Sequence, residues 1–239
     1  MFIIWKREWR SFFHTPVGYV FIGVFLALSG VMFYLSHLRT LSGELLMLLS
    51  QMTLLTMLLS PMLTMRLLCE ERQKRTDSLL FTSPVSLTKI VLGKYLAAAS
   101  VMLTAIALTH VYVLVIGIYG KIYFGEWLVG YVGFTLQSLS FVALDLLVTC
   151  SAKNQVTAAV TAFGANFLLW MADLLAEHLP GTFWREAVGF LSLYDRYEPF
   201  ILGQFSYASV LYFLSFIAVC LTLAVHRLDS RRFSQGGAA

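Results

Sequence analysis

Residues 45–65 read LLMLLSQMTLLTMLLSPMLTM, a stretch without a single charged side chain. A helix needs about 20 mostly apolar residues to cross a bilayer. Strands that cross a membrane instead alternate apolar and polar residues over about ten positions. The run Leu54–Leu59 (LLTMLL) shows no alternation. The stretch therefore predicts a transmembrane helix.

Similar apolar stretches recur along the whole chain of 239 residues, which is 59% hydrophobic and 13% charged. A soluble domain has about 25% charged residues, and its surface could not cover this much apolar area. The composition also excludes a disordered chain. We predict an all-α polytopic membrane protein in which residues 1–239 form a single transmembrane domain. Its six predicted membrane-spanning helices cover 17–37, 45–65, 94–117, 128–150, 155–175 and 207–226.

The basic residues predict the orientation of the chain in the membrane. Most of the 17 Lys and Arg residues fall on one side if the N-terminus is cytoplasmic, as the positive-inside rule requires. Both termini are then cytoplasmic. The net charge of +4 reflects this topology, and no nucleic-acid partner is expected.

Two segments outside the predicted spans are amphipathic. Residues 2–13 place aromatic side chains on one helical stripe and basic ones opposite, which is typical of a helix in the membrane interface. Simple anchoring by aromatic and basic residues would give the same pattern. The outer segment, residues 176–206, is long and rich in apolar side chains, and we expect it to fold back on the membrane as short helices. The residues assigned to the interfacial helix are Trp5, Lys6, Arg7, Trp9 and Arg10.

Residues 66–93 form the longest predicted cytoplasmic segment, called here the coupling segment. Glu70 and Glu71 precede Lys74 and Arg75, an order that complements the dipole of a helix starting near Glu70. An amphipathic helix held at the membrane face would suit a cytosolic partner. The alternative is a solvated, charged loop.

Few ionisable residues fall inside the predicted spans, where charge is costly and often functional. Asp145, His110 and Asp173 are the candidates for a functional role. Each has a structural alternative, such as a carboxylate held by hydrogen bonds near a helix end. A functional role for Asp145 would favour an ATP-independent secondary transporter.

Motifs of catalysis and metal binding are absent from the sequence. There is no GxxxxGK[ST] phosphate loop, because Gly93-Lys94 is followed by Tyr95, and there is no HExxH or GxSxG. The three cysteines have no metal-ligand spacing. We expect no catalytic residues, no metal and no cofactor bound by this chain, so it is not itself an enzyme.

Three motifs together resemble the ABC type-2 exporter permease family, and within it the gliding-motility branch, a relative of the nitrous-oxide reductase maturation permease. The family commonly has glycine where Arg75 stands. The three motifs are Glu70-Glu71-Arg72-x3-Thr76-x2-Leu79-Leu80-x2-Ser83-Pro84-Val85 closing with Leu92-Gly93-Lys94-Tyr95, then Leu191-Ser192-Leu193 with Arg196-Tyr197-Glu198-x-Phe200-x2-Gly203, and Leu228-x2-Arg231-Arg232.

The resemblance implies a permease subunit of an ABC exporter in a bacterial plasma (inner) membrane. Two copies would pair and sit on two copies of a separate cytosolic ATPase, which binds the ATP and Mg. Residues 2–13 match the family's connecting helix, and 176–206 match its re-entrant helices. The complex would export a substrate, or transmit force to an auxiliary membrane or periplasmic protein. The implied ATPase-coupling residues are Glu70, Glu71, Arg72, Arg75, Thr76, Leu79 and Leu80.

Overall fold

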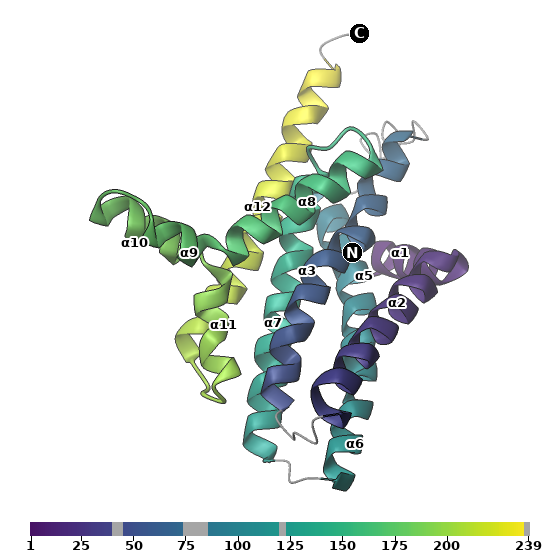
Figure 1. Cartoon of the computed structure of the whole chain (residues 1–239). Coiled ribbons are helices and arrows are strands. Elements are labelled where there is room, and N and C mark those ends of the chain that lie inside the picture. Colours follow the sequence, from purple (N-terminus) through teal and green to yellow (C-terminus); the bar gives the residue numbers. More distant parts are fainter. Residues whose placement is uncertain (40–44, 74–85, 120–122, 237–239) are drawn as a thin grey trace.

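A computed structural model describes residues 1–39, 45–73, 86–119 and 123–236. Over these ranges every regular element is a helix (Figure 1). The elements are α1 (Phe2–His14), α2 (Pro16–Phe33), the π-helical turn η1 (Tyr34–Leu38), α3 (Leu45–Gln73), α5 (Leu87–Leu108), α6 (His110–Tyr119), α7 (Phe124–Thr149), α8 (Gln155–Trp170), α9 (Ala172–Glu177), α10 (Thr182–Phe190), α11 (Leu193–Ile201) and α12 (Tyr207–Gly236).

Among the described residues, five stretches of helix are long and apolar enough to cross a membrane. They correspond to five of the six predicted spans, and each is longer than predicted. The prediction of an all-helical, multi-pass membrane protein is confirmed. The five are Pro16–Leu38, Leu45–Glu70, Leu87–Ile118, Phe124–Thr149 and Tyr207–Ser230.

The predicted span 155–175 is not one continuous long helix. It is divided at Met171 between α8 and the short α9. The 16 residues of α8 extend about 24 Å at 1.5 Å per residue, less than the roughly 30 Å of a hydrocarbon core. Figure 1 shows α8 running obliquely across α3 and α7, against which it packs.

Helices α3 and α7 form the centre of the bundle and pack against each other, while α2, α8 and α12 each pack against one or both. Gly133 of α7 lies directly beneath Phe200 of α11. A Cβ atom at Gly133 would lie 2.4 Å from the Phe200 Cβ, so only glycine permits this close packing. The contact fixes α11 to the central pair.

Helices α10 and α11 lie in the predicted outer segment, and α9 ends at the first two residues of that segment. None of the residues of α10 is buried, and both Phe183 and Trp184 are exposed. In α11, by contrast, Leu193, Tyr197 and Phe200 are buried. Re-entry of these helices into the membrane stays a prediction.

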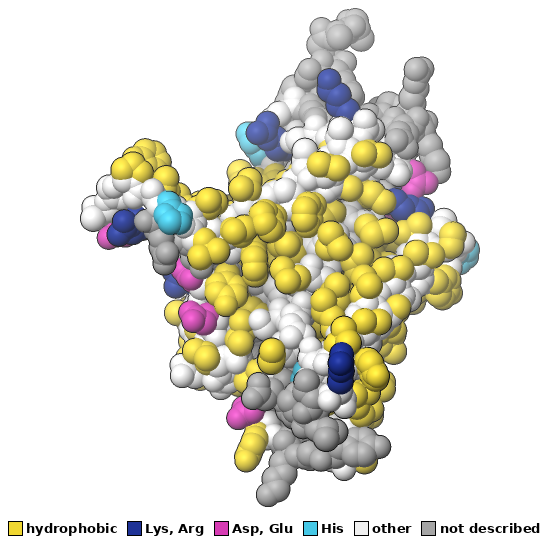
Figure 2. Space-filling view, viewed as in Figure 1, with side chains coloured by type: hydrophobic (Ala, Val, Ile, Leu, Met, Phe, Trp, Pro, Cys, Tyr) yellow, Lys and Arg dark blue, Asp and Glu magenta, His cyan; other side chains and the backbone are white. Residues whose placement is uncertain are grey.

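Hydrophobic side chains cover the middle of the face shown in Figure 2, where exposed apolar residues of several helices adjoin. In water such an area would be unfavourable. A lipid environment accounts for it.

Candidate functional site

Helix α1 lies crosswise to the long helices and packs on α5 and α2 (Figure 1). The Trp5 indole N–H donates a hydrogen bond to the Ser100 hydroxyl at 2.9 Å. A Cβ atom on Gly93 would lie 2.8 Å from the Ile4 Cγ2. The glycine of the Leu92-Gly93-Lys94-Tyr95 motif therefore lets α1 approach α5 closely.

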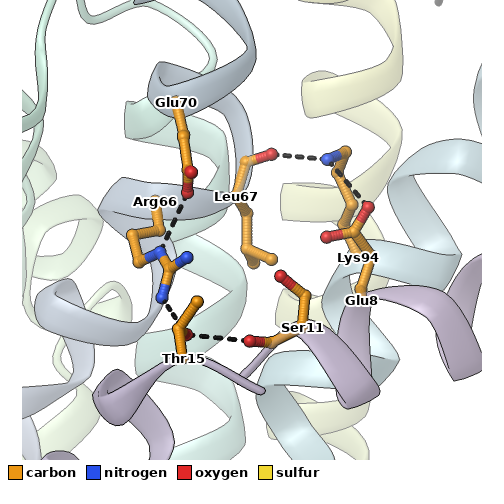
Figure 3. A network of polar contacts seen from close by, with 7 residues as sticks. All are labelled: Glu8, Ser11, Thr15, Arg66, Leu67, Glu70 and Lys94. Atoms are coloured by element: carbon orange, nitrogen blue, oxygen red, sulfur yellow. Dashed lines mark hydrogen bonds and ion pairs between the residues drawn. The ribbon is translucent and has the colours of Figure 1, made fainter. Parts of the chain in front are cut away.

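Lys94, next to this glycine, is buried, with 1% of its side chain exposed. Its Nζ donates to Glu8 Oε1 of α1 at 3.4 Å and to the Leu67 carbonyl of α3 (Figure 3). A buried ammonium group is tolerated only when it is paired and hydrogen-bonded. Lys94 therefore connects α5 to both α1 and α3.

Arg66 makes a second connection one helical turn away from Glu70. Its Nε donates to Glu70 Oε2 at 3.0 Å, and its Nη1 donates to Thr15 Oγ1 at 2.6 Å. The Thr15 hydroxyl in turn donates to the Ser11 carbonyl at 2.8 Å (Figure 3). Arg66 thus holds the end of α3 to the turn between α1 and α2.

These contacts join three elements into one α1–α3–α5 network. Arg66, Leu67 and Glu70 lie in the part of the coupling segment that continues α3, and Lys94 of α5 directly follows the segment. The network therefore connects the two ends of the coupling segment to each other and to α1. The network consists of Glu8, Ser11, Thr15, Arg66, Leu67, Glu70 and Lys94.

The structure places only some of the predicted coupling residues. Glu70 belongs to the network. Residues 70–73 continue α3 without a break from Leu45, whereas the sequence predicted that a separate helix starts near Glu70. Glu71 and Arg72 lie in the same stretch of α3. The other predicted residues, Arg75, Thr76, Leu79 and Leu80, lie outside the described residues.

The predicted interfacial helix matches α1, and its location at a membrane interface stays a prediction. Its aromatic rings form a continuous row, with centroids 5.0 Å apart for Phe2 and Trp5, 6.4 Å for Trp5 and Trp9, and 4.9 Å for Trp9 and Phe13. The basic residues Lys6, Arg7 and Arg10 are exposed. The Arg7 guanidinium lies 2.7 Å from Glu8, so α1 carries a charged and an aromatic face.

Asp145 of α7 is fully buried. Its Oδ1 accepts a hydrogen bond from Asn166 Nδ2 of α8 at 2.7 Å, and the same amide lies 3.4 Å from the Ser60 hydroxyl of α3. Asp145 therefore joins three packed helices. Asn166 and Ser60 were not predicted from the sequence, although Ser60 precedes the proline of α3.

His110 and Asp173 lie elsewhere. The His110 ring stacks on Tyr131 at 4.1 Å between centroids. Tyr131 and Asp145 are 14 residues apart on α7, which separates them by about 21 Å along the helix. Asp173 lies in α9. His110 and Asp145 therefore do not form one intramembrane site, and within the described ranges no group of three potential metal ligands occurs.

The fold is that of a multi-pass helical membrane protein. Its network connects α1, α3 and α5 beside the coupling segment. The family model described as ABC-2 family transporter protein matches residues 13–173, more than half of the chain. The chain therefore belongs to the ABC-2 transporter family, whose members are permease components of ABC transporters that generally pair with an ABC ATPase subunit. The match begins at the end of α1 and ends in α9. No curated protein matches the chain at a significant level.

Proposed function

We propose that this chain is the permease subunit of an ABC exporter and that a separate cytosolic ATPase docks on residues 70–80. The observation that carries the proposal is the α1–α3–α5 network, which ties both flanks of the coupling segment to the bundle. Family membership supports the pairing with an ATPase. ATP and Mg bind to that ATPase and not to this chain.

In this proposal two copies of the chain pair in a bacterial inner membrane, with both termini in the cytoplasm. Helix α8 with α9 makes the sixth crossing, and α1 lies in the inner interface. Helices α10 and α11 then lie on the outer side, where an auxiliary membrane or periplasmic protein would bind. The gliding-motility branch of the family, suggested by the second motif, is part of the same proposal.

The proposed mechanism transmits movement from the ATPase through the network. Closure of the ATPases on ATP displaces residues 70–80, of which residues 70–73 belong to α3. The displacement passes from α3 to α5 through the contact between the Leu67 carbonyl and Lys94. Glu8 carries it on to α1. Nucleotide binding needs to change the balance of two conformations separated by only a few kcal/mol.

Affinity purification of the tagged chain from its native membranes tests this function. We expect an ABC ATPase to copurify in a one-to-one ratio with the chain, and the complex to hydrolyse ATP. The chain alone, reconstituted in liposomes without ATPase, is expected to show no ion-coupled uptake. Uptake by the isolated chain that is abolished by Asp145→Asn would contradict the proposal and support a secondary transporter.

A further inference from the structure

A groove of about 580 Å³ opens where α7, α8 and α12 meet. Its volume falls within the range of about 300–1,000 Å³ typical of small-molecule sites. One wall is apolar and the rim is polar and basic. The lining residues are Leu147, Val148, Ser151, Ala152, Lys153, Asn154, Thr157, Thr161, Leu223 and Arg227.

The charge of the groove is positive and unopposed. Lys153 lies in the turn between α7 and α8, and Arg227 lies on α12. Both are exposed, and neither has an ion-pair partner in the described part of the chain. The groove has no acidic residue among its described lining residues. Two cations from separate elements therefore face the same space.

The apolar wall adjoins surface that suits lipid. Leu147, Val148 and Leu223 line the groove, and beyond it Val156 and Val160 of α8 are 72% and 66% exposed. A hydrocarbon chain can follow this wall while a polar group stays at the rim. The groove is thus suited to an amphiphile with a negative head and an apolar tail.

We propose that this groove binds an anionic phospholipid, with the phosphate beside Lys153 and Arg227 and an acyl chain along the apolar wall. Basic pockets between transmembrane helices bind anionic headgroups in this way. The bound lipid would fasten the short α8 to α7 and α12. The inference requires only that the chain spans a membrane, so it stands or fails separately from ATPase coupling.

Native mass spectrometry of the full chain in mild detergent tests the site with phosphatidylglycerol, phosphatidylcholine and inorganic phosphate as probes. Each basic residue near a membrane contributes about fivefold in affinity for anionic lipid, so Lys153→Gln with Arg227→Gln is expected to weaken phosphatidylglycerol binding about 30-fold. Lys89→Gln is the matched control, because Lys89 is an exposed cation on α5 that does not line the groove. This control is expected to bind as the native chain does.

Selectivity separates a lipid site from other occupants. Phosphatidylcholine is expected to bind equally weakly to the native chain and the double variant, and millimolar phosphate is not expected to displace phosphatidylglycerol. Equal phosphatidylglycerol binding by the native chain and the double variant would overturn the proposal. Displacement of phosphatidylglycerol by inorganic phosphate would also overturn the proposal, since the groove would then hold a soluble anion. A dimer of the chain that binds no lipid in the groove would overturn it as well.

Discussion

Replacing Glu70 and Glu71 together by lysine is expected to reduce the amount of copurified ATPase at least tenfold. An ATPase surface that accepts two acidic side chains would then face two ammonium groups, and like charges across an interface cost several kcal/mol. A tenfold loss needs only about 1.4 kcal/mol. The measurement is the ratio of ATPase to tagged chain after affinity purification.

The control must separate loss of acidic charge from loss of the Arg66–Glu70 ion pair, which is 3.0 Å long. Arg66→Gln breaks the same ion pair and leaves both glutamates in place. This variant is expected to retain the ATPase. If Arg66→Gln lost as much ATPase as the double-lysine variant, the effect would belong to the network and not to the acidic charge. If the folded double-lysine variant retained all of its ATPase, docking through the two glutamates would be refuted.

Lys94→Met is expected to lower the midpoint of thermal unfolding in detergent by roughly 5–10 °C. Breaking a buried ion pair from one side costs about 3–5 kcal/mol, and 1 kcal/mol corresponds to about 2–4 °C in a chain of this size. We expect a loss of stability at the lower end of this range, because the Glu8 side chain is 13% exposed and water can partly solvate it. Methionine has a similar length, so the change removes the charge without opening a large cavity.

Two further variants make the result specific. Lys89→Met removes an exposed lysine from the same helix and is expected to change the midpoint by less than about 2 °C. Adding Glu8→Gln to Lys94→Met removes the carboxylate that has lost Lys94 and keeps, among the described residues, only Arg7, at 2.7 Å, as its ionic partner. This second change is expected to recover part of the loss. Equal midpoints for Lys94→Met and Lys89→Met would show that the buried lysine does not hold the network.

The positions of the long helices along the chain could be predicted, because their apolar stretches are long and are separated by charged segments. The hydropathy of residues 45–65 identifies α3, but not its continuation to Gln73. Arg66 and Glu70 are partly buried there and pair with each other. The helix therefore continues through charged residues, where a prediction from hydropathy alone places its end. The break at Met171 has no comparable signal, since apolar residues continue on both sides of it.

The network was less predictable than the spans. Lys94 stands at the edge of an apolar stretch, where a lysine is normally a solvated membrane anchor. It is instead buried, because α1 folds back and presents Glu8 from 86 residues earlier in the chain. The same holds for Asp145, whose partner Asn166 lies on another helix. Such pairings depend on tertiary packing and leave no periodic pattern in the sequence.

The proposed function requires that the ATPase docks on residues 70–80, beside the α1–α3–α5 network. Site-specific photo-crosslinking tests it directly, with p-benzoyl-phenylalanine in place of Thr76 and, as a control, in place of the exposed Trp184 of α10. We expect an adduct with the combined mass of chain and ATPase from position 76 and none from position 184. An intact complex that gives no adduct at position 76, or an equal one at position 184, would contradict it.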